Sequence, residues 1–382
     1  MAMKRRDFIE AGIGGVAALT VAPGVSRAQS AAAGLPSAMG IVVVGVDGSD
    51  LTPQYLDDYL STGATVWQYS VNTLTFPKLD KIDSFVTANS SKVILAKSYN
   101  DILAAKQAGK VAIVIGCQDL DPLEPEWEAE LPNPPNNWAV STPVTDLPKY
   151  YDRGLRIANL AYNFSNFFGG GDLDPTTPLS KGGRYIVGQM QDIGILVDCS
   201  HSSDQTTFDI IKMAKRPVVC SHSNPAALDD NPRNVSDRII DGIAKTGGLI
   251  GVNALNFFLL WSRADAPYAT TGPFPPLATI TQYVDMIDYI VRRVGIDYVG
   301  IGADWTIGDP PSPEIDPIPS FEFPPEMGYS SPAGLPYVAN FNQVTDLPVL
   351  ATELMRRGYS DLDIAKVLGG NWMRVFGQAW NS

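Results

Sequence analysis

The chain is 382 residues long, has a formal net charge of −13, and contains two histidines and three cysteines. Such an acidic chain is a poor partner for nucleic acid or an anionic membrane surface, because both attract basic proteins. Three cysteines cannot build a disulfide framework, although they permit one bond.

The N-terminal segment has the features of an export signal. A basic cluster containing Arg5 and Arg6 precedes a short Gly/Ala/Val run, and small residues precede a cleavage position near Ala28. The paired arginines indicate the twin-arginine type, and a disordered basic tail is the alternative. We expect residues 1–28 to be a signal peptide, residues 29–382 to form one domain, and the mature protein to be periplasmic or secreted.

Short β-branched runs then alternate with amphipathic segments along the chain. Strands that are apolar on both faces and alternate with helices predict a parallel sheet. Eight such units predict an α/β fold, a (β/α)8 TIM-type barrel. A doubly wound sheet is the alternative, but no Gly-rich fingerprint follows the first strand. The predicted strands are 41–46, 64–70, 111–117, 155–162, 194–200, 217–222, 248–254 and 298–303.

The segments between these strands have the pattern of helices, and several end in Gly or a basic residue. No segment after the signal is long and apolar enough to span a bilayer. The predicted helices are 55–62, 98–109, 179–194, 206–216, 236–247, 283–295 and a tail over 360–380 with Ser360 as its N-cap.

Two long loops interrupt the alternation. Residues 118–148 follow the third predicted strand and residues 304–337 follow the eighth, and both are rich in Pro. Both loops leave the carboxyl ends of strands, where barrels of this kind build their sites. We expect them to be lids or pocket walls.

The tetrapeptide CSHS occurs twice and contains both histidines, His201 and His222. Each copy ends a predicted strand, so both imidazoles are expected at the carboxyl rim of the barrel. Imidazole is a common metal ligand, and neighbouring strand ends can bring two together. Hydrogen-bonded structural histidines are the alternative. Because strand side chains alternate, Cys199 and Cys220 should point the same way as the histidines, as small buried hydrophobes.

Other polar residues follow the same strand ends. Arg233 lies shortly after His222, and its planar fork suits a substrate carboxylate, with a surface salt bridge as the alternative. Asp304 places a carboxylate at the end of a Gly-rich strand. The remaining candidates are Gln118, Tyr162, Asn166 and Asn253.

Five segments together resemble the membrane (renal) dipeptidase family, which comprises zinc dipeptidases on a metal-dependent-hydrolase barrel. The resemblance runs in order from about residue 41 to the C-terminus, and it implies a single dipeptidase-like barrel and a homodimer. Its segments are LVDCSHSSDQTTFDII, KRPVVCSHSNPAALDDNPRNVSD, GGLIGVNA, GIDYVGIGADW and VLGGNW.

The resemblance implies roles for four residues. In the family, two metal ions share a bridging carboxylate. His201 and His222 match the two histidine ligands of one ion. Asp304 matches the aspartate that ligates the other ion and handles protons. Arg233 matches the arginine that holds the substrate carboxylate.

The chain also departs from the family pattern. Ser49 and Leu51 occupy the places of a first-strand histidine and aspartate, Gln118 that of the bridging glutamate, and Tyr162 that of a histidine that polarises the substrate. Asp47 and Asp50 remain nearby. Without the bridging carboxylate, two cations would repel with too little negative charge between them.

We therefore expect one zinc ion on His201, His222 and Gln118, completed by water and Asp304, with two ions or none as alternatives. The predicted function is hydrolysis of a dipeptide or similar small amide by metal-activated water, with Asn166 and Asn253 contributing to substrate binding. The alternative is a periplasmic binding or maturation protein that is metal-free. Altered chemistry with Tyr162 as acid or base is also open.

Overall fold

The computed structural model describes residue 35 and residues 39–124, 146–260, 277–308 and 337–380. The expected signal peptide and most of the two expected long loops lie outside the described residues. Residues 33–382 belong to one compact unit.

The centre of this unit is a parallel sheet whose strands have the order β6-β5-β4-β2-β1-β8-β7, with β3 paired to the first part of β4. Valine and isoleucine dominate these strands, and most strand residues are buried, as expected of a sheet covered on both faces. The strands are β1 (Val43–Asp47), β2 (Val66–Thr73), β3 (Val93–Leu95), β4 (Val111–Asp119), β5 (Leu155–Asn159), β6 (Leu196–Asp198), β7 (Ile250–Val252) and β8 (Val299–Trp305).

Two single-residue bridges close the sheet between β6 and β7. Asp198 of β6 pairs with Val219, and Cys220 pairs with Ile250 of β7. The predicted strand over 217–222 therefore holds its place in the ring through bridges alone. With it, the seven strands other than β3 complete the eight positions of the predicted TIM-type barrel. β3 is an additional short strand that the sequence pattern does not predict.

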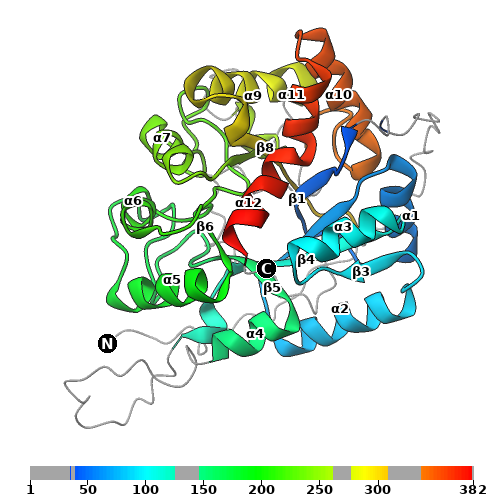
Figure 1. Cartoon of the computed structure of the whole chain (residues 1–382). Helices are drawn as coiled ribbons and strands as arrows, with labels where there is room; N and C mark the ends of the chain where they lie inside the picture. Colours follow the sequence, from blue (N-terminus) through cyan, green and yellow to red (C-terminus); the bar gives the residue numbers. More distant parts are fainter. Residues whose placement is uncertain (1–34, 36–38, 125–145, 261–276, 309–336, 381–382) are drawn as a thin grey trace, which may run out of the picture. The chain divides into compact units, whose positions relative to one another are not determined.

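Helices pack around the outside of the sheet (Figure 1). Serine and threonine side chains accept backbone N–H groups at many of their N-termini, including the expected cap Ser360. The helices are α1 (Pro53–Thr62), α2 (Phe76–Ala88), α3 (Tyr99–Gln107), α4 (Leu147–Arg153), α5 (Lys181–Ile193), α6 (Asp204–Met213), α7 (Asp237–Lys245), α8 (Phe257–Leu260), α9 (Ile280–Val294), α10 (Leu347–Arg356), α11 (Asp361–Ala365) and α12 (Asn371–Ala379).

The C-terminal helix α12 closes the barrel at the amino ends of its strands, and Figure 1 shows it crossing in front of them. Trp372 is fully buried there, and its indole Nε1 donates to the carbonyl of Ile301 at 2.9 Å. The indole of Trp372 fits only because glycines lie beside it: a Cβ on Gly45 or on Gly300 would lie 2.9 Å from an indole atom. The carboxyl ends of the strands are left for a site.

Strand side chains alternate between two hydrophobic layers. One set, including Trp67 and Ile113, packs against the surrounding helices. The other set, including Val114 and Leu196, packs with α3 and α12. Toward the carboxyl ends this second set gives way to polar residues, among them Asp198, which is two positions beyond Leu196.

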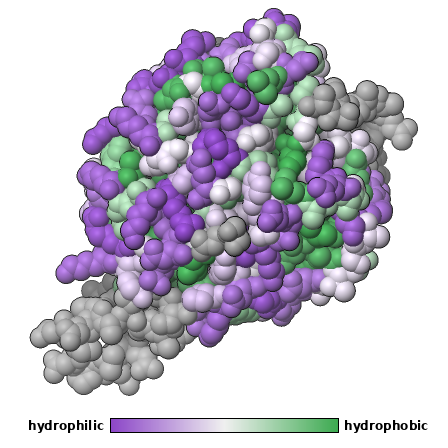
Figure 2. All heavy atoms as spheres, viewed as in Figure 1, coloured by the Kyte–Doolittle hydropathy of each residue, from purple (hydrophilic) through white to green (hydrophobic). Residues whose placement is uncertain are grey.

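Hydrophilic side chains cover most of the face seen in Figure 2, with hydrophobic ones scattered among them. Among the described helices, not one has the length and apolar character that a bilayer crossing requires.

Candidate active site

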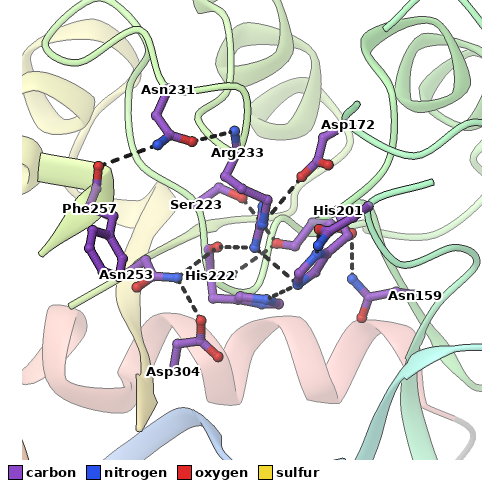
Figure 3. A network of polar contacts seen from close by, with 12 residues as sticks. Asn159, Asp172, His201, His222, Ser223, Asn231, Arg233, Asn253, Phe257 and Asp304 are labelled. Carbon is purple, nitrogen blue, oxygen red and sulfur yellow. Dashed lines mark hydrogen bonds and ion pairs between the residues drawn. The ribbon is translucent and has the colours of Figure 1, made fainter. Parts of the chain in front are cut away.

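His201 and His222 meet at the carboxyl ends of neighbouring barrel positions, with their Nε2 atoms 2.8 Å apart (Figure 3). Both residues are buried. The chain turns after Asp198, and His201 has a φ of 64°, in the left-handed region that non-glycine residues rarely adopt. The expected alternation therefore fails: Cys199 and Cys220 pack in the hydrophobic layer below the helices, while the histidines face each other.

The two cysteines are structural, as expected. Cys199 and Cys220 are free and buried, and burial raises the pKa of each thiol well above its usual value. Neither is poised as a thiolate.

Asn163 fixes the tautomer of His201. The amide Oδ1 of Asn163 lies 2.7 Å from Nδ1 of His201. Because an amide oxygen only accepts hydrogen bonds, Nδ1 of His201 carries the proton and Nε2 keeps its lone pair.

A carboxylate fixes the tautomer of His222 through a hydroxyl group. Ser221 Oγ donates to Asp198 Oδ2 and lies 2.7 Å from Nδ1 of His222. Asp198 Oδ1 accepts the backbone N–H groups of Ser200 at 3.0 Å and Ser221 at 2.9 Å. With Asp198 ionised, the Ser221 oxygen accepts from Nδ1–H of His222, so this imidazole also keeps a lone pair on Nε2.

The two Nε2 lone pairs thus point at one another. Two acceptors cannot bond to each other, so the pair requires a cation or a donor beside it. This donor set fits one metal ion with two imidazole ligands. Within the described ranges, no group of three or more His, Cys, Asp or Glu side chains is arranged to hold a metal. The remaining coordination positions of such an ion would fall to water or substrate.

Both imidazoles are neutral at neutral pH. Burial lowers the pKa of His201 and of His222 well below the usual value, and the positive charge of Arg233 lowers both further. Neutral imidazole is the form that binds metal.

Arg233 is buried against the histidine pair. Its Nη2 lies 3.1 Å from Nε2 of His201, and its Nε lies 3.2 Å from Oδ2 of Asp172. Its backbone N–H donates to the Asn231 amide at 2.9 Å, and Phe258 lies under the guanidinium. Arg233 is therefore no surface ion pair, and it brings a guanidinium into the same space as the imidazoles.

Asn253 connects Asp304 to this network (Figure 3). Its Nδ2 donates to Asp304 Oδ2 at 3.0 Å and approaches the carbonyl of His222 at 3.5 Å. Asp304 has a φ of 57°, so a second side chain of the site lies on strained backbone. Burial raises the pKa of Asp304 to about 6, although Arg233 and the Asn253 amide oppose this rise.

Tyr162 and Asn166 follow β5, which ends at Asn159, earlier than predicted. The Tyr162 ring stacks on His201, with 4.1 Å between centroids. Asn166 holds the shape of its own loop, accepting the backbone N–H groups of Phe168 and Gly169. Its role in substrate binding stays a prediction.

The carboxyl end of β1 is committed to structural contacts. Asp47 Oδ2 accepts the hydroxyl groups of Tyr55 at 2.9 Å and Tyr59 at 2.6 Å, both on α1. Ser49 Oγ accepts the backbone N–H of Ile307 at 2.8 Å, beyond β8. These contacts hold Asp47 toward α1, away from the role of a replacement ligand.

Two further predicted positions complete the picture. Leu51, at the place of the family's first-strand aspartate, packs against the main hydrophobic cluster. Gln118 is buried at the end of β4, and its role as a metal ligand stays a prediction. The structure joins His201, His222 and Arg233 directly.

Four polar residues of this site were not among the candidates from sequence. Asp198 directly precedes the first CSHS and Ser221 lies within the second, so their closeness to the histidines in sequence could have indicated both. Asn163 and Asp172 lie in a loop after β5, and only the fold brings them to the histidines and Arg233.

Comparison with known proteins gives the family. The model of the membrane dipeptidase family (peptidase family M19) matches residues 49–316 and 328–382. A Klebsiella pneumoniae protein described as an uncharacterized protein in the pqqA 5′ region is 30% identical over 242 residues, covering 62% of this chain and 76% of its own length. Dipeptidase ataJ of Aspergillus terreus is 29% identical over 329 residues, covering 80% of this chain and 66% of its own. Dipeptidase tcpJ of Claviceps purpurea is 25% identical over 308 residues, covering 79% and 59%. The chain thus spans less than two thirds of either fungal dipeptidase.

Solved structures agree with this assignment. The crystal structure of an amidohydrolase from Pseudomonas aeruginosa superposes with a TM-score of 0.74 at 27% identity, covering 90% of this chain and 98% of that chain. The probable dipeptidase PvdM from Pseudomonas aeruginosa shares the fold, with a TM-score of 0.66 at 22% identity and coverage of 89% and 95%. The chain belongs to the membrane dipeptidase family.

Proposed function

We propose that the chain hydrolyses dipeptides or similar small amides with one zinc ion held by His201 and His222. The observation that carries this proposal is the pair of Nε2 atoms at 2.8 Å, each with its Nδ1 anchored to an acceptor. That arrangement orients two neutral imidazoles for a common cation. Family membership and relatives named dipeptidase support hydrolysis.

One ion fits the site better than two. The family's bridging carboxylate and first-strand ligands have no equivalents here, because Gln118, Ser49 and Leu51 stand in their places. Asp47 is held by two tyrosine hydroxyl groups. Two dications at a few ångströms need shared negative charge, and the described residues do not supply it.

The side chains divide the work as follows. A zinc ion supplies a Lewis acid that lowers the pKa of a bound water. Arg233 holds the free carboxylate of the substrate through its planar guanidinium. Asp304 accepts a proton from the attacking water when it is ionised, and Asn253 keeps its Oδ2 oriented.

The place of action proposed for the protein is the periplasm or the outside of the cell. The basic pair Arg5 and Arg6, the apolar run and the small residues that end at Ala28 support export as a folded protein. Folding before export would let the histidine pair take up its metal first.

A hydrolysis assay tests the proposal. Purified protein with added zinc is incubated with a panel of dipeptides, and release of free amino acids is measured. Hydrolysis that a chelator abolishes, that zinc restores and that His222→Ala lacks is the expected result. Activity unchanged by the chelator or by His222→Ala would overturn the metal role, and no hydrolysis of any dipeptide by the zinc-loaded protein would overturn the reaction.

A further inference from the structure

One loop contacts both the imidazole of His201 and the guanidinium of Arg233, which lie against each other in the site. The loop after β5 runs from Asn163 to Asp174. At its start, Asn163 orients the imidazole of His201, and near its end Asp172 pairs with Arg233. The guanidinium in turn reaches Nε2 of His201.

The loop is tightly closed on itself. A Cβ on Gly171 would lie 2.2 Å from the backbone of Asn163, so the two ends of the loop are in direct contact. The backbone N–H of Leu173 donates to the carbonyl of Asn163 at 2.9 Å, and that of Asp172 donates to the carbonyl of His201 at 2.9 Å. Asp172 therefore has a fixed position relative to the histidine pair.

The ion pair between Asp172 and Arg233 is secluded from water. The side chain of Asp172 is 6% exposed and that of Arg233 is 1% exposed. A buried carboxylate carries a high desolvation cost, which is sustained only by a specific partner. Burial raises the pKa of Asp172 to about 7, and the positive charge of Arg233, whose Nε lies 3.2 Å from Oδ2 of Asp172, opposes this rise.

We propose that Asp172 is a positioning residue that turns the guanidinium of Arg233 toward a substrate carboxylate. This inference rests on the proposed function. The guanidinium has its Nε 3.2 Å from Oδ2 of Asp172 and its Nη2 3.1 Å from Nε2 of His201, so the carboxylate lies on one side of it and the histidines lie on the other.

Loss of the Asp172 charge should redirect the arginine. Burial raises the pKa of two other buried carboxyl groups, those of Asp198 and Asp304, and the positive charge of Arg233 opposes the rise in both. Without Asp172, either carboxylate becomes the better partner for the guanidinium. A substrate carboxylate would then lose its oriented donor pair.

The experiment compares two non-hydrolysable probes by calorimetry on the zinc-loaded protein. One probe is alanyl-alanine with CH2–NH in place of the peptide bond, and the other is its C-terminal carboxamide. Asp172→Asn removes the charge with little change of shape. Asp174→Asn is the matched control, because Asp174 lies in the same loop and accepts from Ser165 on the partly exposed side. Thermal unfolding checks that each variant folds, and Asp172→Ser is the second variant if Asp172→Asn does not.

We expect the natural chain and Asp174→Asn to prefer the free acid at least tenfold, and Asp172→Asn to lose about tenfold of that preference. In an Arg233→Lys background, Asp172→Asn should cause no further loss, because it acts through the guanidinium. A natural chain without preference would overturn the carboxylate clamp of the proposed function, and this inference with it. If the natural chain prefers the free acid and Asp172→Asn keeps that preference, this inference alone is overturned. It is also overturned if Asp172→Asn weakens the binding of both probes equally.

Discussion

Replacement of Ser221 by alanine removes the connection between a buried carboxylate and the imidazole of His222. Ser221 is fully buried, and its Oγ donates to Asp198 Oδ2 and lies 2.7 Å from Nδ1 of His222. Alanine deletes both contacts and little else, because the side chain loses a single oxygen. The change therefore separates the orientation of the imidazole from the presence of the imidazole.

The size of the effect follows from the two bonds. A hydrogen bond to a charged group contributes about 1.5–3 kcal/mol, so the free energy of unfolding should fall by about 2–3 kcal/mol. Loss of the group that orients a histidine ligand typically weakens metal binding about 10–100-fold. We predict a zinc affinity about 10–100-fold lower for Ser221→Ala than for the natural chain.

Ser223→Ala is the matched control. Ser223 is equally buried and two residues away, but its Oγ faces the hydroxyl of Ser200 at 3.2 Å rather than an imidazole. Zinc affinity is measured by competition with a chromophoric chelator, and the tautomer of His222 by nitrogen-15 chemical shifts. Wild-type affinity together with an unchanged Nδ1–H tautomer in Ser221→Ala would refute the reasoning.

Three further predictions concern other parts of the molecule. The value of kcat/KM should rise as the pH rises through about 6. Burial raises the pKa of Asp304 to about 6, and Asp304 must be ionised to accept a proton. A pH profile of kcat/KM that is flat from about pH 5 to 8 would contradict this prediction. Arg233→Met should tighten zinc binding on the order of tenfold, because it removes a buried positive charge beside His201, and the same chelator competition would count against this if affinity fell. Trp372→Ala should lower the free energy of unfolding by about 3–5 kcal/mol in denaturant titrations. The control Tyr185→Ala, at a half-exposed ring, should change the free energy of unfolding by about 0.5 kcal/mol or less. A loss of about 1 kcal/mol or less for Trp372→Ala would contradict the role of Trp372 in closing the barrel.

The barrel could be predicted from sequence because its strands are apolar on both faces and alternate with helices. The pattern could not show that 217–222 joins the ring through two bridges only, since bridging depends on the neighbouring strands. β3 escaped prediction because three residues, Val93–Leu95, are too few for a periodic signal. Trp372 is apolar in sequence, but its place inside the barrel depends on glycines more than 70 residues away in the chain.

The sequence predicts which two histidines meet in the site, but it predicts the directions of the neighbouring side chains less well. Two identical tetrapeptides at strand ends indicate that His201 and His222 converge, and they do. Strand alternation fails at the turn after Asp198, so the expected direction of the cysteines was wrong. The groups that orient the site, Asn163 and Asp172, come from a loop whose closure is a property of the fold.

The central claim is a single metal ion on the histidine pair, and metal content per chain tests it most directly. Full-length protein purified without chelator is analysed for elements, beside His201→Ala and His222→Ala. We predict about one zinc per chain in the natural protein and essentially none in either variant, as expected when both imidazoles are required. Two ions per chain, or zinc retained in both variants, or a natural protein without metal would contradict the claim.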